Sequence, residues 1–282
     1  MRREVADVEP RLQRRVQRYG WDLAANDYET LWHAQLAGVH AALLRGVALG
    51  SGERVLDVAC GSGLVTFGAA RAVAPGGHVV GVDVSRRMID IARAHAIRNR
   101  VTNASFARMD AEELAIPDAG FDAASCALGL MYMPDPAQAL CEMKRVLRPG
   151  GRIALAVWGE RARCGWSPLF PIVDAEIQSD VCPLFFQLGE RDALAGLCRT
   201  VGFTHIAQRR ITATLDYSDD DEACDAAFIG GPVALAWSRF DANARARVCR
   251  RYLAAIAPWR RERRYAVPGE FVVVTATRPA DD

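Results

Sequence analysis

The sequence predicts an α/β fold in which a mostly parallel sheet is covered by helices on both faces. Two observations lead to this prediction. Over residues 53–158, short apolar runs rich in β-branched residues alternate with helical patterns, as in proteins that bury a parallel sheet between helices. The first of these runs, 55–58, leads through Gly61 and Gly63 into a helix over 64–73. A glycine turn after a buried strand is typical of a site for a nucleotide-like ligand.

The composition excludes several classes of protein. The chain has 282 residues, of which 51% are hydrophobic and 24% charged, so it can form one large domain or one domain with an insertion. A formal net charge of +1 gives no overall attraction to nucleic acid or to an acidic membrane. Its eight cysteines have no CxxC or Cys/His spacing, which predicts reduced thiols and no metal site. No apolar run reaches the ~18 residues of a membrane span, and the first residues lack the apolar stretch of a signal peptide. We therefore expect a cytoplasmic protein.

The N-terminal region is predicted to be helical. The spacing indicates a short amphipathic helix over 10–20 and a second helix over 28–47 that ends in a glycine turn. Four arginines lie on one face of the first helix, at positions 11, 14, 15 and 18. Because Lys144 is the only lysine, we interpret this basic face as solvated and as a product of an arginine-rich composition. The two helices are expected to form a flap, residues 1–50, over the carboxyl edge of the sheet.

The remaining elements follow from hydrophobic periodicity and from glycine, proline and capping residues. We expect strands over 78–83, 104–108, 121–127, 152–158, 203–215 and 270–277. Helices are expected after the N-cap Ser85 and over 134–147, 169–177, 190–201 and 219–239, with a further amphipathic helix that contains 245–256. The main domain is predicted to span 51–282, with helical lid insertions at about 161–188 and 219–260.

The residues of the glycine turn distinguish between the known classes of nucleotide-binding site. A dinucleotide fingerprint requires GxGxxG, but Thr66 stands where the third glycine would fall, and the GK[ST] ending of a P-loop is absent. Instead, DVACGSG, VVGVDVS, MDAEELAIPDAGFDAASC and ALCEMKRVLRPGGRIALAVWG occur in that order. These segments, within residues 19–159, resemble the motifs of the class I S-adenosylmethionine-dependent methyltransferases, in the type 11 and quinone-biosynthesis-like branch. The resemblance implies a Rossmann-like sheet of seven strands.

The resemblance and the residue chemistry together predict the cofactor contacts. The resemblance implies that Asp83 accepts hydrogen bonds from both ribose hydroxyls of S-adenosylmethionine, and that Asp110 takes the adenine amino group while Ala111 supplies backbone contacts. Small residues in the first motif allow the backbone to approach the amino-acid part of the cofactor, and apolar residues can line the adenine slot. These further candidates are Ala59, Gly61 and Gly63 for the turn, Val84 and Met88 for the slot, and Ala127 where donor and acceptor meet.

Each site residue also has a structural interpretation. Asp57 lies inside a buried strand, so it either anchors the glycine turn or contacts the cofactor. Asp83 could instead cap a helix, and Asp110 could be an ordinary loop carboxylate. The weak catalytic candidates are Tyr28, His33 and Tyr132, which either face the methyl acceptor or pack in the core.

The predicted function is methyl transfer to an O, N or C atom of a small-molecule metabolite, by proximity and desolvation and without a metal. The fourth strand is not followed by a [DN]PPY-type sequence, which disfavours nucleic-acid adenine as the acceptor. The alternative is a protein of the same fold that binds S-adenosylmethionine in a non-catalytic or regulatory role. Thr66 and the Asp110 segment disfavour a nicotinamide-dependent oxidoreductase. The sequence leaves the oligomeric state open, with a homodimer among the alternatives.

Overall fold

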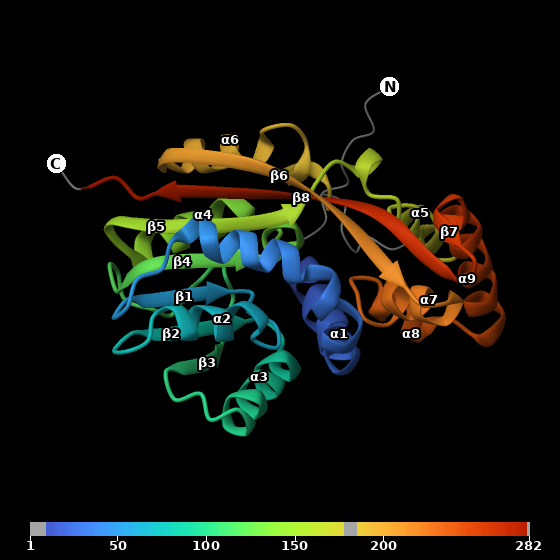
Figure 1. Cartoon of the computed structure of the whole chain (residues 1–282), viewed down its shortest axis with the longest axis horizontal. Coiled ribbons are helices and arrows are strands. Elements are labelled where there is room, and N and C mark those ends of the chain that lie inside the picture. The colour runs from blue at the N-terminus through green and yellow to red at the C-terminus, as the bar shows by residue number, and fades with distance from the viewer. Residues whose placement is uncertain (1–9, 178–184, 281–282) are drawn as a thin grey trace.

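The centre of the molecule is one twisted sheet, seen in a computed structural model that describes residues 10–177 and 185–280 (Figure 1). The strand order is β3-β2-β1-β4-β5-β8-β6, and the two-residue β7 pairs with β8. The strands are β1 (Arg54–Val58), β2 (His78–Asp83), β3 (Ala104–Arg108), β4 (Phe121–Ala127), β5 (Leu147–Trp158), β6 (Thr204–Tyr217), β7 (Arg260–Arg261) and β8 (Arg264–Thr277).

The sheet is mostly parallel. Strands β1 to β5 pair in parallel, whereas β8 runs antiparallel to both β5 and β6. The predicted fold class is confirmed, and β7 is an addition to the seven expected strands. Strand β5 begins at Leu147 rather than at 152, because Leu147 already pairs with Phe121 of β4, ahead of an irregular stretch that ends where Arg152 pairs with Ala123.

The N-cap predicted at Ser85 is confirmed, but the prediction of one helix over 219–239 is wrong, because the Gly230-Gly231-Pro232 stretch separates α7 (Asp220–Phe228) from α8 (Ala234–Arg239). The N-cap Ser85 of α3 (Arg86–Arg98) accepts a hydrogen bond from the Met88 N–H at 3.1 Å, and Asp135 caps α4 (Pro136–Val146) in the same way. The remaining helices are α2 (Leu64–Ala72), α5 (Leu169–Asp174), α6 (Ala193–Val201) and α9 (Ala242–Ile256), with the short turns η1 (Leu130–Tyr132), η2 (Arg161–Arg163), η3 (Gln187–Gly189) and η4 (Ala257–Trp259).

The prediction of two N-terminal helices is wrong, because α1 is a single helix, Pro10–Val47. Gly20 does not end the first helix. A Cβ added to it would lie 3.8 Å from the Cβ of Leu235, an ordinary van der Waals distance, so Gly20 faces α8 from within a continuous helix. Buried positions recur mostly at steps of three or four residues from Gln13 to Val47, with the half-buried Tyr28 between Ala25 and Trp32, which gives α1 one continuous inward face.

Helix α1 connects the two halves of the molecule. It packs against β4 and β5, and also against α7 and α8, which gather with α5 and α9 beside the far ends of β6 and β8 (Figure 1). The predicted insertion at 161–188 is described only in part, because residues 178–184 lie outside the described residues. The domain boundaries at residue 50 and around the insertions stay predictions. Within the described residues, none of the helices combines the length and the apolar character that a bilayer crossing requires.

Candidate functional site

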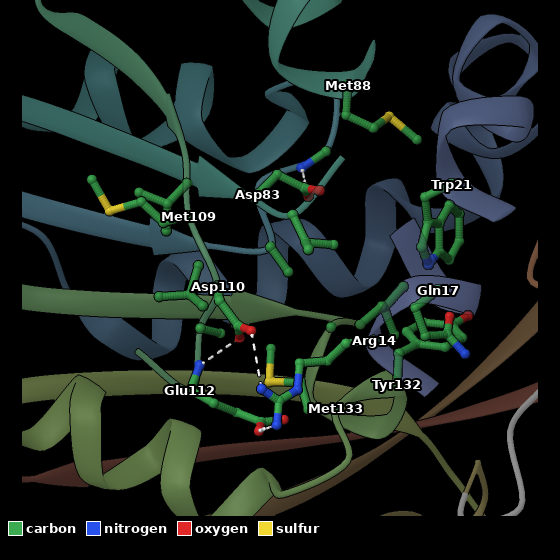
Figure 2. A pocket seen from close by; sticks show the side chains of 18 of the residues that line it. Arg14, Gln17, Trp21, Asp83, Met88, Met109, Asp110, Glu112, Tyr132 and Met133 are labelled. Carbon is green, nitrogen blue, oxygen red and sulfur yellow. Dashed lines mark hydrogen bonds and ion pairs between the residues drawn. The ribbon is translucent and has the colours of Figure 1, made fainter. Parts of the chain in front are cut away.

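A pocket lies at the carboxyl ends of β1, β2 and β4, below the N-terminal half of α1 (Figure 2). It encloses about 810 Å³ when its open mouth is included, which is within the range of small-molecule and cofactor sites. Its position follows from the topology. From β1 the chain continues to β2 on one side, whereas from its neighbour β4 it continues to β5 on the other side, so the strand order reverses between β1 and β4. Ligands in open α/β sheets bind at such a switch point.

Asp83 is the buried carboxylate of this pocket. It ends β2, and it accepts the Gly61 N–H on Oδ2 at 2.9 Å and the Ser85 N–H on Oδ1 at 2.8 Å. Burial raises the pKa of Asp83 to about 6, against the lowering effect of these two hydrogen bonds. A carboxylate can accept about four hydrogen bonds, so two acceptor positions remain for a ligand. A pair of neighbouring hydroxyl groups matches that capacity.

The glycine turn leaves open space beside Asp83. Gly61 has a φ of +54°, and a Cβ built on it would meet nothing closer than Tyr28 Cε1 at 3.9 Å. A ligand can therefore approach this backbone without displacing protein atoms. Ala59 and Leu128, at the ends of β1 and β4, also have positive φ values of 55° and 59°. Such backbone is uncommon outside glycine, and here both residues line the pocket.

Asp57 has the anchoring role. It is 1% exposed, and it accepts hydrogen bonds from the Thr66 hydroxyl at 2.6 Å and from the Ser125 hydroxyl at 2.8 Å. These bonds connect β1 to α2 and to β4. Thr66 therefore has a structural function at the position where a dinucleotide site would carry glycine. Burial raises the pKa of Asp57 to about 6, while these hydroxyl bonds oppose the shift.

A cluster of charged side chains, Arg14, Asp110 and Glu112, lines the pocket near the end of β3. Asp110 accepts the Glu112 N–H on Oδ1 at 3.0 Å, and its Oδ2 lies 3.6 Å from Arg14 Nη1. Arg14 also pairs with Glu112, at 3.4 Å. Burial raises the pKa of Glu112, and Arg14 opposes that shift. Figure 2 shows the Arg14 guanidinium between the two carboxylates, so this arginine of α1 is not simply a solvated charge as the sequence suggested.

Aromatic side chains form the wall opposite Asp83. Trp21 of α1 contacts Tyr28 edge-to-face with ring centres 5.7 Å apart, and Tyr132 of η1 with centres 5.2 Å apart. Burial, followed by the nearby Asp83 charge, raises the pKa of Tyr28. Tyr28 is therefore a neutral phenol near pH 7, which can donate a hydrogen bond but does not act as a base.

The structure brings most of the predicted site residues together. Those that line the pocket are Tyr28, Ala59, Gly61, Asp83, Val84, Met88, Asp110, Ala111, Ala127 and Tyr132. Gly63 is not in the lining. It is the N-cap of α2 with a φ of 95°, where a Cβ would stand 2.7 Å from Phe67 Cε2, so its role is to shape the turn. His33 is also outside the lining and is exposed on α1.

Sequence reasoning named Tyr28 of α1 as a site candidate but missed the other three residues that this helix contributes to the pocket. Arg14, Gln17 and Trp21 come from this helix, and Glu112 and Met133 come from loops of the sheet domain. The three α1 residues are spaced at i, i+3 and i+7, which the sequence shows. This spacing indicates that they share one face of a helix, but not what that face covers. Among the described residues, no cluster of three or more His, Cys, Asp or Glu side chains could hold a metal ion.

The matches to known sequences fall on the same part of the chain. Residues 49–168 match the family model of a methyltransferase domain. Over 133 residues the chain is 36% identical to a ubiquinone biosynthesis O-methyltransferase of Alkalilimnicola ehrlichii, covering 47% of this chain and 51% of that protein. It is 38% identical over 138 residues to a ubiquinone/menaquinone biosynthesis C-methyltransferase of Hahella chejuensis, covering 47% and 55%. The chain thus spans about half the length of the curated relatives that it matches.

Solved structures resemble most of the chain in fold. The [4+2]-cyclase SpnF superposes with a TM-score of 0.60 at 22% identity, covering 89% of this chain and 83% of that one. Phosphoethanolamine N-methyltransferase 2 of Haemonchus contortus, in complex with S-adenosyl-L-methionine, superposes with a TM-score of 0.59 at 19% identity, covering 92% and 57%. At these identities the likeness concerns the fold alone.

Proposed function

We propose that the chain is a methyltransferase of the class I S-adenosylmethionine-dependent family, in its quinone-biosynthesis-like branch, because residues 49–168 match the model of a methyltransferase domain and about half of the chain is 36–38% identical to methyltransferases of quinone biosynthesis. It transfers the methyl group of S-adenosylmethionine to an O, N or C atom of a small-molecule metabolite. The observation that carries the proposal is the Asp83 carboxylate beside the open backbone of Gly61. Together they offer a diol acceptor and a surface that a ligand can approach closely.

The residues present fit the cofactor of this family. Asp83 would hold the ribose hydroxyls with its two remaining acceptor positions, and Gly61 and Ala59 would lie against the amino-acid part. Val84 and Met88 would border the adenine, with Asp110 near its amino group. When bound there, S-adenosylmethionine supplies an electrophilic methyl group on a sulfonium, and the sulfur retains the bonding pair as S-adenosylhomocysteine.

The chain's own contribution is to position the reactants and exclude water. The three carboxylates that line the pocket are all engaged by the protein: Asp83 by backbone N–H groups, and Asp110 and Glu112 by backbone N–H groups and Arg14. Tyr28 is neutral because its pKa is raised. None of these groups is poised as a general base. The acceleration therefore comes from proximity and desolvation, which are sufficient for an activated methyl donor.

The closest alternative is a protein that binds S-adenosylmethionine without transferring its methyl group. Isothermal titration with S-adenosylmethionine and S-adenosylhomocysteine, followed by mass-spectrometric screening of a metabolite library for the gain of one methyl group, separates the two. Binding of both ligands with methylated product supports the proposed function. Binding without product in the library favours the non-catalytic alternative, and binding of neither ligand overturns both.

Asp83→Asn tests the carboxylate in this titration, and Asp90→Asn is its matched control. The substitution keeps the shape of the side chain but removes its charge and one acceptor oxygen. We expect it to weaken S-adenosylhomocysteine binding by about tenfold or more, because hydrogen bonds to a charged group contribute about 1.5–3 kcal/mol. Asp90→Asn, on the exposed face of α3, should leave binding unchanged.

The cytoplasmic location, the oligomeric state and the domain boundaries stay predictions from the sequence.

A further inference from the structure

A second pocket lies against the first, and we call it the aromatic pocket. The two pockets share four wall residues: Trp21, Tyr28, Leu128 and Tyr132. The aromatic pocket encloses about 520 Å³ with its mouth included. It extends from the shared wall, away from Asp83, toward α7 and α9. Its other aromatic walls are Trp32, Trp158, Trp166, Phe185, Tyr217 and Tyr252.

The described lining of the aromatic pocket carries no Asp, Glu, Lys, Arg or His side chain. Its tyrosines are also neutral, since burial raises the pKa of Tyr217 and of Tyr252. A charged group placed there would lose its hydration without meeting an opposite charge, which is strongly unfavourable. The pocket therefore selects an uncharged occupant.

The ring arrangement gives the pocket fixed walls. Trp158 contacts Trp32 edge-to-face with ring centres 6.2 Å apart, and Trp166 in the same manner with centres 4.8 Å apart. Trp166 in turn contacts Phe185 with centres 5.6 Å apart. Such pairs add stability beyond the burial of their area. Rigid aromatic walls of this kind favour a ring-containing occupant with large apolar surfaces.

Two polar atoms in these walls have no partner. The indole nitrogens of Trp32 and Trp166 are buried and make no hydrogen bond. The two residues are only 8% and 4% exposed, so solvent water does not replace the missing partner. The Trp32 nitrogen lies 3.3 Å from the position of a Cβ built on Gly230, another lining residue. A buried N–H donor without an acceptor costs about 1–3 kcal/mol, and most such groups in native proteins are paired. An occupant that carries an acceptor oxygen would remove this cost.

We propose that the aromatic pocket is the methyl-acceptor subsite. It takes an uncharged, ring-containing metabolite whose carbonyl or ether oxygen accepts a hydrogen bond from the indole N–H of Trp32 or Trp166. This inference rests on the proposed function: because Trp21, Tyr28 and Tyr132 line both pockets, the subsite lies directly beside the pocket that would hold the methyl donor. Trp32 and Trp166 are then the residues that determine specificity.

The test uses three ring compounds of similar size that differ in polarity: 1-tetralone with a carbonyl, tetralin without one, and 1-naphthoate with a negative charge. Each is titrated by calorimetry into the full chain saturated with S-adenosylhomocysteine, so that no transfer takes place. We expect 1-tetralone to bind about tenfold more tightly than tetralin, the ratio that one added hydrogen bond provides, and 1-naphthoate not to bind. This comparison requires no variant. Equal affinity for tetralin and 1-tetralone, binding of 1-naphthoate, or no binding of 1-tetralone overturns the inference.

Variants then identify the donor. Trp32→Phe and Trp166→Phe each keep a ring but remove the N–H, and we expect at least one of them to reduce the preference for 1-tetralone over tetralin to less than about threefold. Trp237→Phe is the matched control, because Trp237 stacks on Phe228 and is not among the residues that line the pocket. A preference that survives in both variants, or that is lost equally in the control, contradicts the assignment. Failure to bind S-adenosylhomocysteine in the first step refutes the proposed function, whereas failure of the tetralone comparison alone refutes only the subsite.

Discussion

Asp57 and Asp83 have the same pKa shift but different functions. Burial raises the pKa of each to about 6. The oxygens of Asp57 bind the hydroxyl groups of Thr66 and Ser125, which belong to the structure itself. Those of Asp83 bind two backbone N–H groups and border open space. The neighbours of each carboxylate, and not its pKa, therefore distinguish the anchor from the ligand-binding group.

The raised pKa of Asp83 predicts that S-adenosylhomocysteine binding depends on pH. The ribose hydroxyls donate to the ionised carboxylate, so affinity should be constant above pH 7 and should fall as the pH drops through about 6. With one proton taken up, the affinity at pH 5 should be about tenfold below its plateau. Titration calorimetry between pH 5 and 8 measures this dependence. In Asp83→Asn the corresponding slope should disappear, and a slope that persists there would assign the effect to another group.

At the scale of elements, α1 is the part of the chain that completes the site. Its carboxylate Asp22 accepts hydrogen bonds from the Ser85 hydroxyl at 2.6 Å and from the Arg87 N–H at 3.1 Å, so it fastens α1 to the start of α3. Further along α1, the Oε2 atom of Glu29 lies 3.2 Å from Nδ1 of His95. Toward its N-terminus, Arg14 joins the helix to Asp110 and Glu112. The helix is thus attached on both sides of the pocket that it covers.

Arg14→Gln should weaken S-adenosylhomocysteine binding by about two- to fivefold. The expected effect is small because Arg14 is 36% exposed and partly exposed ion pairs contribute about 0–1 kcal/mol. Its loss would release Asp110 and leave the buried Glu112 without a cation. Calorimetry at low and high salt measures the change, which should shrink at high salt. Arg15→Gln, an exposed neighbour on the same helix, should behave as the unmodified chain, and an equal loss there would remove Arg14 from the site.

The sequence predicted the sheet domain far better than α1. The strands β2, β3 and β4 have the expected bounds, because continuous apolar runs and glycine turns mark both ends of each strand. Helix α1 was predicted as two helices, over 10–20 and 28–47, and the structure has no break between them. The contact of Gly20 with Leu235 of α8 joins segments far apart in the sequence. Arg14 was missed for the same reason, since its partners Asp110 and Glu112 lie on another element.

For the molecule as a whole, α1 also contributes to the core. Leu43 is fully buried on its inward face, in the part of the helix that packs on the sheet. Leu43→Ala should lower the free energy of unfolding by about 2–5 kcal/mol, through lost burial and the cavity left behind. Urea denaturation measures the change. Leu43 does not line either pocket, so S-adenosylhomocysteine affinity should stay within about twofold. Leu23→Ala, at a position 47% exposed, should change stability by less than about 0.5 kcal/mol.

The acceptor side of the molecule was the part least accessible to sequence reasoning. The aromatic pocket draws its walls from α1, β5, α9 and the chain around Trp166. In the sequence, Trp32, Trp158 and Tyr252 each look like ordinary core residues of their own elements. Only the fold brings them to one place, and only the structure reveals that two indole nitrogens there have no partner.

Trp21 and Tyr28 are common to both pockets, so each ligand would contact side chains that the other also contacts. We therefore expect positive heterotropic coupling: S-adenosylhomocysteine should tighten 1-tetralone binding, and 1-tetralone should tighten S-adenosylhomocysteine binding by the same factor, as thermodynamic linkage requires. Calorimetric titrations in both orders of addition measure the two factors. Because α1 carries both residues, this coupling would favour a ternary complex. In that complex the bound S-adenosylhomocysteine would slow release of the acceptor, and the acceptor would slow release of S-adenosylhomocysteine.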